Sequence, residues 1–176
     1  MRSVGRIAFP VYVFLMTEGI VHTRNWKRYG VRLGVFALLS DIPFDMMATG
    51  RLMAWTDQNV FFTLLIGLLT VKSAEYFCTK INGLTETNIH FLWLTATAAG
   101  CAAAELLKTD YGYIGIVLTT LFYLLRNDRA KQCILGFFWM FCNLGRLSYL
   151  WGLTAAFLLI YAYNGRRGGK DTQIGK

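Results

Sequence analysis

Glu18 and His22 are the pair of side chains in this sequence with the clearest capacity for acid–base chemistry. They lie four positions apart, a spacing that puts two residues on the same face of a helix. A carboxylate held beside an imidazole can orient the ring and support proton transfer to and from a substrate. The same residues would also suit a polar cap at a membrane interface, where ionisable groups cost little. The spacing alone leaves both interpretations open.

A cluster of cations follows this pair directly. Arg24, Lys27, Arg28 and Arg32 lie within nine positions. Guanidinium and ammonium groups at this density would suit a ligand that carries several phosphates. Short basic segments also orient membrane helices and contact anionic lipids, so topology is the alternative explanation. Arg32 differs from the others because it falls within the next apolar run, where a charge needs a partner.

Asp41 and Asp45 form a second pair at i and i+4, and this pair lies within an apolar run. Counted from the basic segment at about 1.5 Å per residue, Asp41 would lie roughly 15 Å into the hydrocarbon layer, near its middle. An ionised group at that depth is costly unless it faces a partner or a wet cavity. We therefore expect Asp41 to be functional. Its candidate partners are Arg6, Arg32 and Asn59.

The composition indicates that these groups lie in or beside a membrane. Of the 176 residues, 55% are hydrophobic and only 16% are charged, with a mean hydropathy of +0.42, whereas soluble domains average about 25% charged residues. Apolar runs near the length of a membrane span predict an all-α, polytopic transmembrane helical bundle with about seven spanning segments. The runs cover 4–21, 31–48, 59–77, 89–107, 111–125, 132–144 and 147–163. Residues 1–164 would form a single domain, followed by a polar cytoplasmic tail at 165–176.

The fourth run, 89–107, is unusual because it contains the sequence TATAAGCAAA. Small residues let helix backbones approach each other closely in lipid. We therefore expect this helix inside the bundle.

The distribution of charge predicts an orientation. The net charge is +8, and most of the Lys and Arg residues lie in alternate turns. If segment 22–29 is cytoplasmic and Met1 is the true start, the amino terminus lies outside and the carboxyl terminus inside. This pattern differs from the basic stripe of a nucleic-acid-binding protein, so we expect no nucleic-acid partner. The cysteines and histidines lack ligand spacing, so we expect neither a disulfide framework nor a metal site.

Four segments carry a resemblance to a known family: GRIAFPVYVFLMTEGIVHTRNWKRYGVRL, FALLSDIPFD, QNVFFTLLIGLL and DYGYIGIVL. They resemble the TraX family, bacterial membrane proteins named from conjugal transfer, whose type member is linked to amino-terminal acetylation of pilin. That family is distantly similar to the membrane acyltransferase-three proteins, which use cytoplasmic acetyl-CoA. The resemblance implies a multi-pass protein of the bacterial cytoplasmic (inner) membrane. It would use acetyl-CoA as co-substrate to acetylate a pilin-like or other envelope protein, or a glycan.

The resemblance also implies roles for the polar side chains. The cations would bind the phosphates of CoA: Arg24, Lys27, Arg28 and Arg32. The reactive centre would be surrounded by Glu18, His22 and Asp41. Further polar groups within the membrane would be Arg6, Asp45 and Asn59. Family members usually begin with another helix that carries an Asp-His pair, and this sequence starts just before the GRIAFP segment, so an upstream histidine is the alternative catalytic base.

Two functions from different classes fit these observations. One is a membrane acetyltransferase that uses acetyl-CoA. The other is a non-catalytic membrane component of conjugal transfer or envelope assembly that binds a protein partner. A small transporter fits less well, because the sequence shows neither inverted halves nor paired broken helices.

Overall fold

The computed structural model describes residues 2–49, 59–81, 83, 85–144 and 150–163, and these residues form α-helices and no strand. The helices are α1 (Arg2–His22), α2 (Trp26–Thr49), α3 (Val60–Lys80), α4 (Glu86–Leu106), α5 (Gly112–Leu124), α6 (Arg129–Leu144) and α7 (Leu150–Ala162). The all-α prediction is confirmed for this part of the chain. The predicted tail at 165–176 lies outside the described residues.

Two of these helices, α3 and α4, are long and apolar enough to cross a membrane, with 21 residues each and mean hydropathies of 1.5 and 1.3. The helices α5 and α7 are also apolar, but each contains only 13 residues, and a full crossing needs about 20. The described helices are therefore compatible with a membrane protein. The arrangement of about seven spanning segments remains a prediction.

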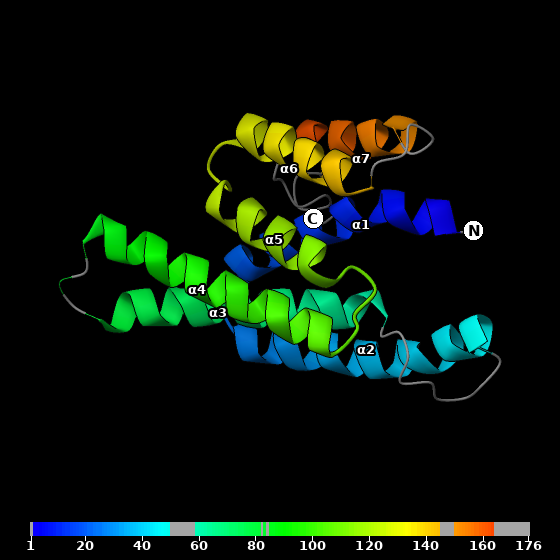
Figure 1. Ribbon diagram of the computed structural model, residues 1–176, viewed down its shortest axis with the longest axis horizontal. Helices are drawn as coiled ribbons and strands as arrows, with labels where there is room; N and C mark the ends of the chain where they lie inside the picture. Colours follow the sequence, from blue (N-terminus) through cyan, green and yellow to red (C-terminus); the bar gives the residue numbers. More distant parts are fainter. Residues whose placement is uncertain (1, 50–58, 82, 84, 145–149, 164–176) are drawn as a thin grey trace, which may run out of the picture.

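Successive helices run in alternating directions (Figure 1). As a result, the α1–α2, α3–α4 and α5–α6 connections lie toward the same end of the molecule, on the left of Figure 1, together with the end of α7. We call this the basic end, after the cationic side chains Arg24, Lys27, Arg28, Lys80, Arg126, Arg129 and Lys131. The end of α2, the start of α3 and the α4–α5 connection lie toward the opposite end.

The core lies where α1, α3 and α5 meet. Phe9 and Phe14 of α1, Leu68 of α3 and Phe122 of α5 are all buried. A Cβ atom on Gly115 of α5 would come within 2.9 Å of the Phe9 ring, so the glycine permits a close approach of α1 and α5. The helices α6 and α7 pack beside α1 and α5, and α2 packs on the outside of α3 (Figure 1).

The position of α4 corrects the expectation that this helix lies inside the bundle. Only 11% of its spanning window is buried, compared with 39% for α3. Gly100 faces inward, and a Cβ atom there would overlap the side chain of Thr70 in α3. Phe91 and Leu94 on other faces of α4 are exposed. The small residues therefore serve a one-sided close contact, because close packing against one neighbour does not require burial all round.

The start of α2 corrects a second expectation. The sequence pattern placed 22–29 in a turn, whereas α2 begins at Trp26. Asn25 precedes the helix, and its Oδ1 accepts a hydrogen bond from the backbone N–H of Arg28 at 3.1 Å, which is the bond of a helix N-cap. Lys27 and Arg28 therefore lie in the first turn of α2 rather than in a loop.

Candidate functional site

Glu18 joins two nitrogen-containing side chains at the basic end. One carboxylate oxygen, Oε2, lies 3.3 Å from Nε2 of His22. The other, Oε1, lies 3.2 Å from Nη1 of Arg129 at the start of α6. The Glu18 side chain is 18% exposed and the His22 side chain is 61% exposed. The predicted pairing of Glu18 with His22 therefore forms, with the carboxylate sheltered and the imidazole open to a substrate.

Arg129 is fixed by further contacts. Its Nη1 also donates to Oε1 of Gln132 at 3.2 Å. Its guanidinium carbon lies 4.6 Å from the ring centroid of Phe14 and 5.7 Å from that of Tyr163. A cation over an aromatic face is attracted by the ring quadrupole. Arg129 therefore ties the start of α6 to α1 and to the residue that follows α7.

Gln132 anchors this cluster to the core. It is only 1% exposed, and its Nε2 donates to the backbone carbonyl of Phe122 at 2.8 Å. That carbonyl belongs to the last turn of α5, where helix carbonyls lack intrahelical partners. The amide of Gln132 thus satisfies a buried acceptor with its nitrogen and orients Arg129 with its oxygen.

Arg129 and Gln132 are the residues that sequence reasoning missed. In the sequence, Arg129 lies in a short basic segment between two apolar runs, yet it contacts Glu18, 111 positions away. A usable signal was the position of Arg129 immediately before an apolar run, with Gln132 one helical turn later. That signal predicts a sheltered cation but does not identify its partner.

The predicted phosphate-binding cations remain open to a ligand. Arg24, Lys27, Arg28 and Arg32 all have exposed side chains. Within the described ranges, the ion pairs include none of the four. Arg32 therefore corrects the expectation of a partner within the apolar run, because it lies on an exposed side of α2.

The start of α2 lies against the end of α1 because of a glycine. A Cβ atom on Gly19 would lie 3.1 Å from the hydroxyl oxygen of Tyr29. Tyr29 belongs to the second turn of α2, so the contact holds the first turns of this helix beside Glu18. The cations on those turns are brought to the same end of the molecule as the Glu18–His22 pair (Figure 1).

Asp41 is not part of this arrangement. The side-chain amide nitrogen of Asn59 donates to Oδ1 of Asp41 at 3.2 Å and to the backbone carbonyl of Ala37 at 2.7 Å. The amide oxygen of Asn59 accepts from the backbone N–H of Phe61 at 2.9 Å and so caps α3. Asn59, which was one of the three candidate partners expected from the sequence, is thus a partner of Asp41.

The position of Asp41 along α2 separates it from Glu18 and His22. It lies fifteen residues along α2 from Trp26, or about 22 Å at 1.5 Å per residue. The contact with Asn59 at the start of α3 places it toward the end opposite the basic end. The structure therefore does not bring Asp41 to the proposed reactive centre. The side chains of Arg6 and Asp45 lie outside the described residues.

A second polar network lies at the basic end between α3 and α5. Nζ of Lys72 lies 2.6 Å from Oε2 of Glu75, and the Tyr123 hydroxyl donates to Oε1 of Glu75 at 2.9 Å. The guanidinium of Arg126 lies 4.4 Å from the Tyr123 ring centroid. Lys72 and Glu75 are three positions apart on one helix, a spacing that favours their contact, whereas Tyr123 comes from a different helix. In the part of the chain that the structure describes, no group of three or more His, Cys, Asp or Glu side chains is arranged to hold a metal ion.

Comparison with known proteins identifies the family of the chain. A family model described as "TraX protein" matches residues 1–174. The chain belongs to the TraX family. The resemblance in the four sequence segments is thereby confirmed, and both the Glu18–His22–Arg129 cluster and the cations of α2 lie within the matched part of this TraX chain.

A relative with a described role matches part of this TraX chain. It is the "Probable fimbrial assembly protein FimC, serogroup H1" of Dichelobacter nodosus, which is 33% identical over 78 residues. The match covers 40% of the TraX chain and 32% of the relative, so it spans about a third of that protein. No solved structure matches.

Proposed function

We propose that this TraX protein is a polytopic protein of the bacterial cytoplasmic membrane that transfers an acetyl group from acetyl-CoA. The acceptor would be an amine or hydroxyl group of a pilin-like or other envelope protein, or of a glycan. The observation that carries the proposal is the bridge from Glu18 to His22 and Arg129 at the same end as the exposed cations of α2. The name of the fimbrial relative supports a pilus-related acceptor.

The exposed cations on the first turns of α2 suit the phosphates of acetyl-CoA. Its phosphates would be held by the exposed guanidinium and ammonium groups on the first turns of α2, because charge-assisted hydrogen bonds are the strong ones for such ligands. When bound, acetyl-CoA supplies an activated acetyl group. The remaining requirement is a group that removes a proton from the acceptor.

His22 is suited to remove that proton. Nε2 of its imidazole faces Glu18, so in the neutral ring Nε2–H donates to the carboxylate and Nδ1 is the proton acceptor. Nδ1 would take the proton of the attacking amine or hydroxyl, and the proton would later leave with the thiol product. Glu18 orients the ring and offsets its charge when it is protonated. Arg129 acts as a positioning residue, because it holds the second carboxylate oxygen.

The direct test uses the full chain, reconstituted in lipid vesicles and supplied with acetyl-CoA labelled in the acetyl group and with pilin-derived peptides. We expect His22→Gln to lower acetyl transfer by about a hundredfold or more, as expected for loss of a general base. Lys27→Gln combined with Arg28→Gln should raise KM for acetyl-CoA with a smaller effect on kcat. Lys80→Gln is the matched control, because Lys80 is an exposed cation of the basic end on a different helix.

Two outcomes would contradict this site. Transfer that survives both His22→Ala and Glu18→Ala would exclude the assigned reactive groups. An equal effect of Lys80→Gln and of the α2 substitutions on KM would show that the cations act only through overall charge.

A second candidate function is a non-catalytic component of envelope or fimbrial assembly that binds a protein partner. The observation that favours it is the name of the fimbrial relative. This function predicts cross-links to a pilin-like protein in cells, and it predicts that acetyl-CoA does not protect Lys27 from chemical modification. Transfer of the labelled acetyl group from acetyl-CoA therefore separates the two candidate functions, because only the acetyltransferase should show it.

A further inference from the structure

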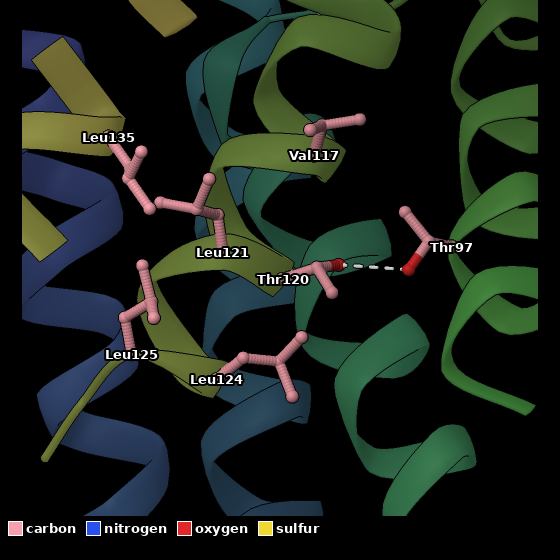
Figure 2. Close-up of a pocket in the computed structure, with 7 residues that line it drawn as sticks. All are labelled: Thr97, Val117, Thr120, Leu121, Leu124, Leu125 and Leu135. Atoms are coloured by element: carbon pink, nitrogen blue, oxygen red, sulfur yellow. Dashed lines mark hydrogen bonds between the residues drawn. The ribbon is translucent and has the colours of Figure 1, made fainter. Parts of the chain in front are cut away.

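A groove on the side of α5 has no role in the proposed acetyl transfer. Its volume is about 350 Å³, which lies at the lower end of the about 300–1,000 Å³ typical of ligand sites. Thr97 of α4 lies on one side and Leu135 of α6 on the other, with Val117, Leu121 and Leu124 of α5 between them (Figure 2). The groove therefore opens between α4 and α6, which both pack against α5.

The walls of this groove suit hydrocarbon. Its two polar side chains, Thr97 and Thr120, lie 3.3 Å apart (Figure 2). The Thr97 hydroxyl donates to the backbone carbonyl of Trp93 at 2.7 Å, and the Thr120 hydroxyl donates to that of Ile116 at 3.1 Å. The Thr97 hydroxyl is also the donor in a hydrogen bond to that of Thr120 (Figure 2). Because both hydroxyl hydrogens have acceptors within the protein, these side chains offer no donor to a polar ligand. Burial of apolar surface is the available driving force.

The length of the groove matches one membrane leaflet. The lining residues of α5 extend from Val117 to the residue after its end, Leu125, a span of about 12 Å at 1.5 Å per residue. Half of a hydrocarbon core of about 30 Å is roughly 15 Å. One acyl chain of a single leaflet would therefore lie along the whole groove.

A positively charged side chain follows the last groove residue of α5 in the chain. Arg126 follows Leu125 directly, and its Nη1 donates to the backbone carbonyl of Tyr123 at 3.0 Å. The guanidinium lies 4.4 Å from the Tyr123 ring centroid, and that ring stacks on Trp93 at 5.7 Å. The Arg126 side chain is exposed, so guanidinium N–H groups remain for an anion. An aromatic pair and an arginine are typical of the headgroup level of a membrane.

We propose that this groove binds one acyl chain of an anionic phospholipid of the cytoplasmic leaflet, with the lipid phosphate against Arg126. An apolar groove followed in the chain by an exposed arginine is complementary to such a lipid, whereas a protein helix would need a longer apolar surface. The inference depends on the membrane placement in the proposed function, but not on acetyl transfer. The expected role is a structural lipid that fills the gap between α4 and α6.

The test is native mass spectrometry of the purified full chain, titrated in detergent with phosphatidylglycerol or with phosphatidylcholine of the same acyl chains. We expect one phosphatidylglycerol to bind more tightly than phosphatidylcholine. Arg126→Gln should weaken phosphatidylglycerol binding about fivefold and remove the preference. Leu124→Trp, which fills the groove from a side chain that is 49% exposed, should weaken both lipids.

Matched controls make the result specific. Lys80→Gln removes another exposed cation of the basic end, and Leu94→Trp enlarges an exposed leucine of α4 outside the groove; neither should change lipid binding. Leu135→Trp fills the groove from α6 and serves as an independent variant if Leu124→Trp fails to fold.

Three results would overturn the inference. The first is equal binding of the two lipids by the wild-type chain. The second is an effect of Lys80→Gln as large as that of Arg126→Gln, which would indicate a general basic surface. The third is a dimer that Leu124→Trp and Leu135→Trp dissociate, which would make a second copy of the chain the occupant. Carbonate extraction that releases the chain from cell membranes would refute the membrane placement itself, whereas loss of acetyl transfer alone would not affect the lipid site.

Discussion

Replacing Arg129 by methionine should lower the free energy of unfolding, because the substitution removes the contact between Arg129 and Glu18. The substitution keeps an apolar stem but removes the guanidinium. The Arg129 side chain is 26% exposed and the Glu18 side chain is 18% exposed. A hydrogen bond to a charged group contributes about 1.5–3 kcal/mol, and a cation–π contact contributes about 0.5–1 kcal/mol at an exposed site and more when it is desolvated. Partial exposure reduces the electrostatic part. We therefore expect a loss of roughly 2–3 kcal/mol in the free energy of unfolding.

The assay is equilibrium unfolding in mixed micelles for Arg129→Met, Glu18→Gln and the double variant. A double-mutant cycle isolates the interaction of the pair, and for residues in contact the coupling is typically about 0.5–3 kcal/mol. We expect about 1–2 kcal/mol here, because both groups are sheltered but not fully buried. Arg129→Lys should recover only part of the loss, since lysine keeps the charge but not the planar fork that stacks on Phe14.

Lys131→Met supplies the control for this cycle. Lys131 also pairs with a carboxylate at the basic end, but the two side chains are 68% and 44% exposed, and such pairs contribute little. Its removal should leave the unfolding curve unchanged. Strict additivity of the Arg129 and Glu18 substitutions would refute the conclusion that Arg129 holds in position the carboxylate that orients His22.

Three further predictions concern the scaffold. Asn59→Ala removes the α3 cap and two hydrogen bonds to α2, so thermal unfolding should show a loss of about 2 kcal/mol; an unchanged curve would contradict the α2–α3 link. Gly100→Val places a β-branched side chain against Thr70 and should cost about 1–3 kcal/mol through overpacking, whereas Ala102→Val on an exposed position of α4 should not. Hydrogen bonds from the backbone N–H of Lys131 and then from its side chain hold the pKa of Asp128 below its usual value. Asp128 therefore contributes its full stability above the unfolded-state pKa, which is about 4. This contribution is lost as the pH falls through the lower folded-state pKa. Melting temperatures between pH 2 and pH 6 should therefore depend less on pH in Asp128→Asn.

The parts of this structure that depend on neighbouring residues could be predicted from the sequence. Apolar runs gave the positions of the helices, and the four-residue spacing gave the Glu18–His22 contact, because both follow from the local geometry of a helix. Asn59 as a partner of Asp41 was among the expected alternatives, since a carboxylate within an apolar run has few polar groups within reach.

The parts that depend on distant contacts could not be predicted. Arg129 reaches Glu18 across 111 positions, and no local pattern specifies which helices pack together. The Glu75–Tyr123 hydrogen bond, across 48 positions, was missed for the same reason. The error at α4 has a different origin, because small residues indicate a close helix contact but not how many sides of the helix are covered.

The orientation of the basic end decides whether the proposed chemistry can occur, because the proposed acetyl donor is cytoplasmic. Lys131 belongs to the basic end and Lys108 to the α4–α5 connection at the opposite end, and both side chains are exposed. In a chain whose native cysteines are replaced by serine, we expect a membrane-impermeant thiol reagent to label Lys108→Cys in spheroplasts and Lys131→Cys only after permeabilisation. The positive-inside bias predicts this result. The reverse pattern would place His22 on the side without acetyl-CoA and would refute acetyl transfer by this site, whatever its geometry.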